Sequence, residues 1–249
     1  MASDLKEAGG RARLFVDASL ESGGAVTLDE GQSHYLLHVL RAKAGDRVLL
    51  FNGRDGEWQG EIAATSKRGV TVALRARTAL QTEVPDVWLL FAPVKKTPSD
   101  YLAQKATELG ARKLQPVFTR RTIVTRVNQE RLKANAVEAA EQSARLTVPE
   151  ICDPVALEKL LNAWPGERRI FFCDEGGDAK PLAQALREGG EGPCAILTGP
   201  EGGFDPEERE ALRTHSFVTP VTLGPRILRA DTAALAALTI WQSVRGDFV

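Results

Sequence analysis

Short apolar segments alternate with amphipathic ones from residue 87 to residue 244, and this alternation limits the possible folds more than any other feature. The segment 87–94 has no charged residue, which is typical of a strand buried on both faces of a parallel sheet. The predicted strands are 87–94, 113–118, 168–173, 194–198 and 218–223, and the predicted helices are 98–109, 129–145, 179–187, 206–214 and 230–244. We therefore expect an α/β domain over residues 81–249.

The first 80 residues have a different pattern, rich in short strands. Strands are predicted at 13–17, 46–51, 57–64 and 69–78, with turn chemistry at Asn52-Gly53. Between them, Tyr35, Leu36, Val39 and Leu40 follow helical spacing, so a short helix over 33–40 is expected. A small β-barrel or sheet over residues 1–80 is the simplest fold, joined to the second domain by a polar linker at 80–85.

Charge is unevenly distributed although the net charge is only −1. Residues 95–147 hold 11 basic and 5 acidic side chains, whereas residues 148–249 hold 10 basic and 16 acidic ones. This balance excludes a globally basic protein, but a basic middle segment indicates a surface that faces a polyanion. The alternative is a set of ordinary solvated helix faces.

The three cysteines, Cys152, Cys173 and Cys194, lie 21 residues apart without a CxxC pair. This spacing fits neither a disulfide framework nor a zinc site, so we interpret them as small buried hydrophobic residues of a reducing compartment. No apolar stretch reaches the roughly 18 residues that span a bilayer, and the first residues lack the apolar core of a signal peptide. A cytoplasmic protein is expected.

A glycine-rich loop, LTGPEGGF at 197–204, follows a predicted strand directly. Ligands of open α/β sheets bind beyond the carboxyl ends of strands, and glycines there let the backbone approach a ligand. Glu201 in this loop is a candidate acceptor for a ribose hydroxyl or an amine. The loop is neither a Walker A motif nor a GxGxxG fingerprint, so the usual dinucleotide-binding fold has no support.

A second strand-to-helix junction, VTLGPRILRADTAA at 221–234, places Arg226 and Arg229 near a helix N-terminus. Two arginines there suit an anionic ligand or a developing negative charge. Asp231 or Thr232 is expected to cap the helix. The alternative, a capping carboxylate paired with one arginine, leaves the other arginine unexplained.

With these two loops, the sequence resembles the ribosomal small subunit methyltransferase E family of the SPOUT superfamily. Further matching stretches are HYLLHVLRAKAGD (34–46), QKATELGARKLQP (104–116), TRRT (119–122) and EAAEQSAR (138–145). The resemblance extends from Arg13 to Gln242 in the family's order. Two positions depart from it: Asp231 stands where the family usually has glutamate, and Arg120 where it commonly has an acid.

The resemblance implies an enzyme that methylates N3 of a uridine in 16S ribosomal RNA with S-adenosylmethionine. It also implies a deep trefoil knot in residues 81–249, a homodimer formed through the knotted region, and a PUA-like RNA-binding barrel in residues 1–80. A non-catalytic RNA-binding ribosome-assembly factor, or a SPOUT methyltransferase that acts on another RNA, are the alternative functions.

The chemistry of uracil N3 requires removal of an imide proton and stabilisation of charge on O2 and O4, and a guanidinium suits the second task. Arg229 or Arg226 is expected to serve there, while Glu201, Asp231 or water remain open as the proton acceptor. The expected cofactor-binding residues are Leu197, Thr198, Gly199, Pro200, Glu201, Gly202, Leu223, Gly224, Ile227, Leu228, Arg229 and Thr232.

Contacts to RNA phosphates are expected from Arg41, Lys95, Arg121 and Arg145, which lie in or beside the matching stretches. The alternative for each is an ordinary surface ion pair. His34 and His38 are four residues apart, a possible metal spacing, but no third ligand accompanies them, so no metal is expected. His34 is instead expected to be a polar residue of the barrel helix or an RNA contact.

Overall fold

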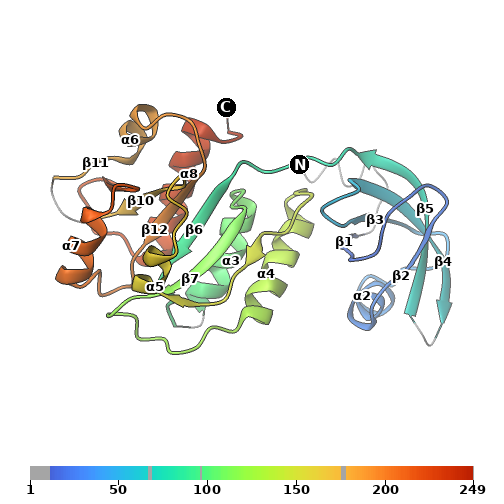
Figure 1. The fold of residues 1–249 in the computed structure, drawn as a ribbon. Helices are drawn as coiled ribbons and strands as arrows, with labels where there is room; N and C mark the ends of the chain where they lie inside the picture. Colours follow the sequence, from blue (N-terminus) through green and yellow to red (C-terminus); the bar gives the residue numbers. More distant parts are fainter. Residues whose placement is uncertain (1–11, 67–68, 96, 175–177, 249) are drawn as a thin grey trace. The chain divides into compact units, whose positions relative to one another are not determined.

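The computed structural model describes residues 12–66, 69–95, 97–174 and 178–248 (Figure 1). The chain divides into two compact units. The first unit comprises Met1–Glu83 together with Ala140–Val148, and the second comprises Val84–Ala139 together with Pro149–Val249. A segment that lies far along the sequence therefore completes the N-terminal unit.

The first unit is a five-stranded sheet in the order β1-β3-β4-β5-β2. Its strands are β1 (Arg13–Phe15), β2 (Ala25–Thr27), β3 (Arg47–Phe51), β4 (Glu57–Ser66) and β5 (Gly69–Ala79). β1 pairs with β3 in parallel, and the remaining pairs are antiparallel. The four predicted strands are confirmed, but β2 was missed because its three residues bury only Val26 and show no readable alternation.

One helical segment accompanies this sheet, α2 (Glu30–His34) continued by the π-helical turn η1 (Tyr35–Val39). It begins at the N-cap Asp29, whose carboxylate accepts a hydrogen bond from the Gln32 amide at 2.7 Å. The short helix predicted over 33–40 is confirmed, and two of the apolar residues that indicated it, Tyr35 and Val39, are 39% and 60% exposed. Leu36, fully buried, faces the sheet with Leu37 and Leu40 packed beside it, and these leucines fill the contact.

Arg13 joins the distant segment to the first unit. Its buried guanidinium donates to the Ala140 carbonyl at 2.6 Å and to the Arg145 carbonyl at 2.8 Å. It also pairs with Glu57 at 2.6 Å and lies 3.8 Å from the centre of the Phe51 ring. The Ala140 carbonyl lies in the last turn of α4 (Gln129–Gln142), where helix carbonyls lack a partner within the helix, and the Arg145 carbonyl lies just beyond it. α4 ends three residues before its predicted end.

The second unit is an eight-stranded sheet in the order β11-β13-β10-β12-β6-β7-β8, with β9 paired to β7. Every pair is parallel. The strands are β6 (Val87–Phe91), β7 (Lys113–Phe118), β8 (Glu150–Ile151), β9 (Val155–Ala156), β10 (Arg169–Cys173), β11 (Lys180–Pro181), β12 (Cys194–Thr198) and β13 (Val218–Thr222). The predicted parallel α/β sheet is confirmed.

Helices cover both faces of this sheet, as Figure 1 shows. They are α3 (Thr97–Glu108), α4, α5 (Leu157–Asn162), α6 (Leu182–Glu188), α7 (Pro206–Thr214) and α8 (Ala230–Arg245). Leu89 and Ile196 pack against α3, α6 and α8, whereas their neighbours Leu90 and Leu197 pack against α5 and α7. This alternation explains the uncharged strand segments, since both faces of each strand are buried. The sequence did not reveal α5, β8, β9 and β11, which have six or two residues each.

No helix in the described ranges is long and apolar enough to cross a membrane.

We expect Arg13→Met to destabilise the first unit by about 3 kcal/mol, because Glu57 and two carbonyls lose a buried charged donor. Hydrogen exchange of the β3 and β4 amides as a function of urea concentration reports this unit alone. Arg75→Met is the matched control, since the Arg75–Glu61 pair is 58% and 40% exposed and contributes at most about 1 kcal/mol. Equal effects of the two substitutions would contradict the anchoring role of Arg13.

Candidate functional site

A cavity of about 350 Å³ lies at the carboxyl edge of the second sheet. β10 lies between β12 and β13, and because all three are parallel, the chain leaves them at the same edge. The lining comprises Arg121, Cys173, Asp174, Thr198, Gly199, Pro200, Gly202, Gly203, Phe204, Arg209, Val221, Thr222, Leu223, Gly224, Pro225, Arg226, Ile227, Leu228, Ala230 and Ala233. The two loops singled out in the sequence therefore face one space.

The first loop begins at Thr198, which is 1% exposed at the end of β12. Gly199 is required there, because a Cβ atom would lie 2.6 Å from the ring of Phe204. That ring packs edge-on against Phe172 of β10 at 4.8 Å. The loop thus folds back on the sheet and exposes its backbone to the cavity. It ends at a capping box, in which Asp205 and Glu208 satisfy the first amides of α7.

The second loop follows β13 and has an open, apolar inner surface. Gly224 has φ +116°, a conformation that side-chain-bearing residues rarely adopt, and a Cβ atom there would meet nothing within 4 Å. Its amide donates to the Thr222 hydroxyl at 3.2 Å. Ile227 lines the cavity although it is 84% exposed. A large apolar side chain left in solvent beside a cavity indicates a ligand with an apolar face.

The start of α8 differs from the prediction. Arg229 is the N-cap residue and makes no side-chain cap, while Asp231 lies inside the first turn. The Asp231 carboxylate accepts from the Thr232 amide at 2.7 Å. The expected cap at Asp231 or Thr232 is wrong because the helix begins at Ala230, so both residues already have helical positions. The negative charge of Asp231 still interacts favourably with the positive N-terminal end of the α8 dipole.

A buried carboxylate, Asp174, lies at the end of β10 and borders the cavity. One oxygen accepts from Arg209 Nε at 2.6 Å, and the other accepts from Arg213 Nε at 2.9 Å and Nη2 at 2.6 Å. Arg213 also pairs with the exposed Asp178 at 2.7 Å, which holds the pKa of Asp178 below its usual value. Asp178 and Asp174 together hold the pKa of Arg213 above its usual value. Asp174 therefore fastens α7 to the sheet.

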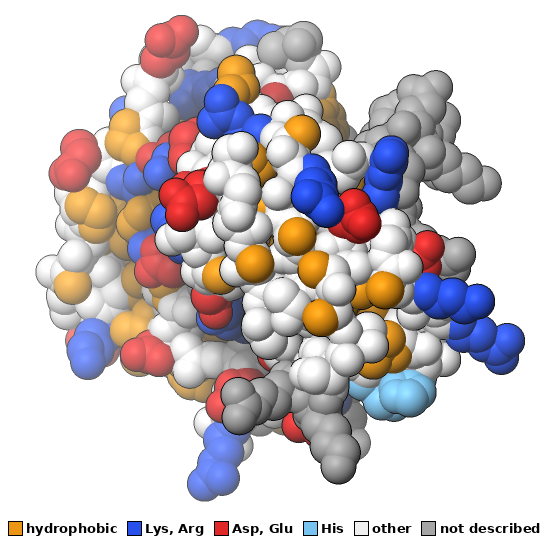
Figure 2. Space-filling view, turned by 90° about the vertical axis from the view of Figure 1, so that its right-hand side faces the viewer, with side chains coloured by type: hydrophobic (Ala, Val, Ile, Leu, Met, Phe, Trp, Pro, Cys, Tyr) orange, Lys and Arg blue, Asp and Glu red, His pale blue; other side chains and the backbone are white. Residues whose placement is uncertain are grey.

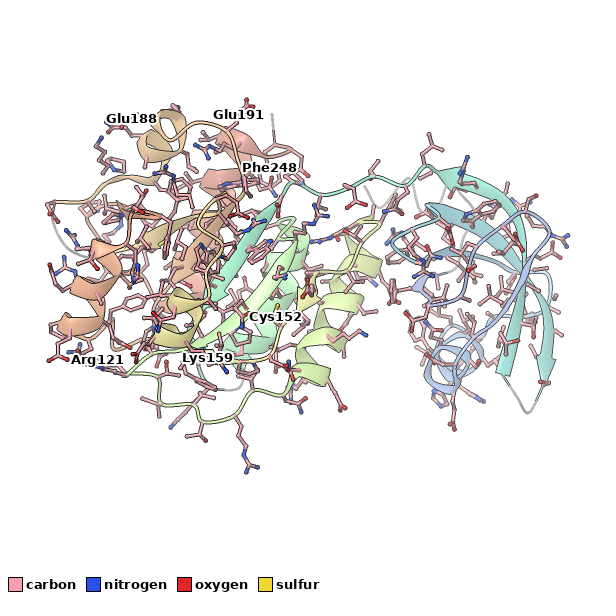
Figure 3. All side chains as sticks on the ribbon, in the orientation of Figure 1. Arg121, Cys152, Lys159, Glu188, Glu191 and Phe248 are labelled. Carbon is pink, nitrogen blue, oxygen red and sulfur yellow. The ribbon has the colours of Figure 1, made fainter. Side chains whose placement is uncertain are left out.

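The loop after β7 holds the other end of α7. Arg120 pairs with Asp205 at 3.0 Å and with Glu207, and its amide donates to Glu208 at 2.8 Å. Its neighbour Arg121 donates from Nη1 to the Gly202 carbonyl at 3.0 Å and lines the cavity. Figure 3 shows Arg121 on this loop, beside the end of α7. The acids at the start of α7 account for a basic residue at position 120.

Most of the expected cofactor-binding residues line the cavity, but four do not. Leu197 is fully buried and packs against α5 and α7, while Glu201, Arg229 and Thr232 are exposed outside the lining. Sequence reasoning missed Cys173, Asp174 and Arg209. The position of Asp174 directly after an apolar strand was the available signal, since Thr198 and Thr222 occupy the corresponding ends of the neighbouring strands.

The cysteines are less uniform than expected. Cys194 is buried, whereas Cys152 and Cys173 are half-buried, so the expectation of three buried residues is correct for one of them. Burial raises the pKa of Cys173, which borders the cavity, to about 12. Its thiol is therefore protonated at neutral pH and is a poor nucleophile. Within the described part of the chain, no three His, Cys, Asp or Glu side chains form a metal-binding group.

The residues expected to contact RNA lie in different places. Arg41 and Arg145 belong to the first unit, and Lys95 and Arg121 belong to the second. Arg41, Lys95 and Arg121 are exposed. Arg145 is half-buried and donates from Nε to the Thr147 hydroxyl at 3.0 Å.

Comparison with known proteins defines the class first. The profile of the RNA methyltransferase domain family matches residues 81–242, and that of the RNA methyltransferase PUA domain matches residues 28–75. The chain is therefore an α/β protein of the RNA methyltransferase class with an N-terminal PUA domain.

Individual relatives are more specific. Ribosomal RNA small subunit methyltransferase E of Rickettsia conorii is 30% identical over 91% of this chain and 93% of its own length. The Synechocystis protein of that name is 33% identical over 91% of this chain and 75% of its own length. The crystal structure of the Neisseria gonorrhoeae protein of that name, bound to S-adenosyl methionine, has a TM-score of 0.87 at 28% identity and covers 96% of this chain and 99% of that one. The chain belongs to the ribosomal RNA small subunit methyltransferase E family.

We expect Asp174→Asn to destabilise the docking of α7 by about 1–3 kcal/mol, because Arg209 and Arg213 lose a buried charged acceptor. Hydrogen exchange of the α7 amides measures this change directly. Asp178→Asn is the control, because Asp178 is the other partner of Arg213 but its side chain is 74% exposed. We expect this substitution to change stability by less than about 1 kcal/mol. Protection of α7 that is unchanged in Asp174→Asn would refute the anchor.

Proposed function

We propose that this protein transfers the methyl group of S-adenosylmethionine to N3 of a uridine in 16S ribosomal RNA. The observation that carries the proposal is a single cavity, lined by the two loops, in a chain of the ribosomal RNA small subunit methyltransferase E family. The family supports methylation of small-subunit ribosomal RNA, and the Neisseria relative supports the cofactor. The choice of N3 rests on the resemblance of the loops.

The cavity fits S-adenosylmethionine by size and chemistry. Its volume of about 350 Å³ lies in the range of small-molecule sites. The open space in front of Gly224 and the exposed Ile227 suit a planar apolar base, and the backbone around Gly199 and Gly202 offers polar groups for its edge. Leu223 and Leu228 complete the apolar lining. When bound, the cofactor supplies a methyl group activated by an adjacent sulfonium.

The reaction requires an electrostatic partner for the uracil ring. Uracil N3 loses its proton to a base and bonds to the methyl carbon, while the electron pair of the breaking C–S bond stays on sulfur. The negative charge that deprotonation leaves on the ring is shared with O2 and O4 until the bond to the methyl carbon forms, and a guanidinium donor there lowers the barrier. We assign this task to Arg226, which lines the cavity and has no hydrogen-bond or ion-pair partner among the described residues. Arg229, at the N-cap of α8, is the second choice.

The proton acceptor is proposed to be Glu201, Asp231 or a water molecule. Glu201 is exposed on the first loop and has no hydrogen-bond partner in the described ranges, so its carboxylate is available. Asp174 is a poor acceptor, because both of its oxygens already accept from arginines.

The RNA would be held by phosphate contacts from Arg41, Lys95, Arg121 and Arg145. Arg121 borders the cavity, so a phosphate bound there would lie close to the reacting nucleotide. Arg145 is the least available of the four for a phosphate contact, because its Nε already donates a hydrogen bond to the Thr147 hydroxyl. The knot, the homodimer formed through the knotted region and the cytoplasmic location are further parts of the proposal that rest on the resemblance.

A methyl-transfer assay tests the proposal. The protein is incubated with labelled S-adenosylmethionine and small ribosomal subunits that lack the modification, and the RNA is digested to nucleosides. We expect the label in N3-methyluridine. Gly202→Val should abolish labelling, because its side chain would lie against Arg121 within the cavity lining, at a backbone position that a side chain can adopt without strain. Gly166→Val, at an open loop position outside the lining, is the matched control and should retain activity.

Other outcomes of this assay separate the alternatives. Label in another nucleoside would overturn the uracil-N3 assignment but would still support methyltransferase activity. Bound cofactor without any labelled RNA would favour a non-catalytic ribosome-assembly factor.

Arg226→Gln is expected to lower kcat by about 10²–10³-fold, because the lost donor acts on charge that develops in the transition state. The Kd of S-adenosylmethionine, measured by calorimetry, should change little. Arg187→Gln, an exposed charge on α6 outside the cavity, is the control. A large loss of kcat in Arg229→Gln together with a normal Arg226→Gln would transfer the assignment to Arg229.

A further inference from the structure

The outer face of α2 and η1 exposes two large hydrophobic residues, Tyr35 and Val39. We define the η1 face as His34, Tyr35, His38 and Val39 of this segment, together with Arg41, two residues beyond the end of η1. Tyr35 is 39% exposed, Val39 is 60% exposed, and both histidines and Arg41 are exposed. Figure 2 shows histidine side chains bordered by hydrophobic ones at the lower edge of this view.

The inner face of the same segment is fixed to the sheet and needs none of these residues. Leu36 is fully buried, and the Ser33 hydroxyl accepts from the Val70 amide of β5 at 3.0 Å. The amide of Leu40 donates to the Tyr35 carbonyl, which forms the π-helical turn. Such turns occur frequently at functional sites. The exposed side chains therefore stand on a rigid support.

The two histidine rings lie together, with centroids 4.7 Å apart and planes inclined by 39°. With Tyr35, they present ring surfaces to solvent from adjacent positions of the helix. Unpaired nucleobases stack on such rings without regard to sequence.

Arg41 occupies a backbone position that favours glycine. Its φ is +53°, and the following amide, of Ala42, donates to the Leu36 carbonyl at 2.8 Å to close the helix. Glycine is the usual residue at this position, because a Cβ atom in the left-handed conformation costs conformational energy. The Arg41 guanidinium has no hydrogen-bond or ion-pair partner among the described residues. Local folding therefore does not account for an arginine here.

We propose that the η1 face binds unpaired bases of the RNA substrate by stacking, with Arg41 on an adjacent phosphate. This inference rests on the proposed function, and the PUA-domain match over residues 28–75 includes the whole face. Ring surfaces beside a free guanidinium suit a polyanion that carries bases better than they suit an apolar protein partner.

Arg41→Gly separates this role from folding. We expect its thermal stability to equal or exceed that of the wild-type protein, because glycine relieves the left-handed strain. Its KM for small ribosomal subunits that lack the modification should rise roughly tenfold, and the salt slope of binding should fall by about one. The affinity for S-adenosylmethionine should be unchanged.

Arg41→Gln and Arg77→Gln form a matched pair for the charge. Arg77 is exposed on β5. It lies seven residues beyond Val70, the residue of β5 that contacts α2, and is therefore roughly 23 Å along the strand from that contact. Of these two variants, Arg41→Gln should raise the KM and Arg77→Gln should leave it unchanged. Tyr35→Ala and His38→Ala should each raise it as well, since each removes a stacking surface.

Ultraviolet crosslinking of the wild-type protein to the same subunits, followed by trypsin digestion, should yield RNA adducts on the peptide 14–41. Unchanged KM in all four η1-face variants, or the absence of adducts from that peptide, would overturn the inference while wild-type methylation continues. If the wild-type protein transfers no methyl group, the proposed function fails, and filter binding of the subunits by the same variants still decides for or against the η1 face.

Discussion

The parallel pairing of β12 and β13 on either side of β10 is the constraint on which the candidate site depends. Two loops that have α7 and β13 between them along the chain leave the sheet at the same edge only because their strands run in the same direction. The strands are buried on both faces, so this arrangement is held by the main core of the second unit. The loops can then be rich in glycine and open to ligand without loss of the fold.

Charge, more than apolar burial, holds the helix that follows the first loop. Leu212 is the buried residue of α7, whereas Asp174 fastens the helix through Arg209 and Arg213, and Arg120 pairs with its first acids. Because α7 begins where the first loop ends, the ion pairs also restrain the loop. The buried carboxylate of Asp174 depends on its two arginines, as an unpaired charge there would be costly. Both oxygens of Asp174 accept from these arginines, so Asp174 serves as an anchor of α7.

Local pattern was sufficient for most elements. The uncharged strand segments and the glycine-rich loops are short-range features, and the structure contains each of them where the sequence indicates. Elements without a short-range signal were missed, such as β2 and α5. Spacing indicated the helical segment of α2 and η1, but it does not say which of several apolar residues meets the sheet. Leu36, Leu37 and Leu40 fill that contact and leave Tyr35 in solvent.

The sequence by itself determined the α/β class, the two loops and the resemblance to the family, because these depend on residue type and local spacing. Only the tertiary structure brought Cys173, Asp174 and Arg209 to the cavity and left Glu201 and Arg229 outside its lining. It also joined residues 140–148 to the first unit through Arg13. These contacts link residues more than thirty positions apart, and which distant side chains meet is decided by strand order and packing rather than by any local pattern.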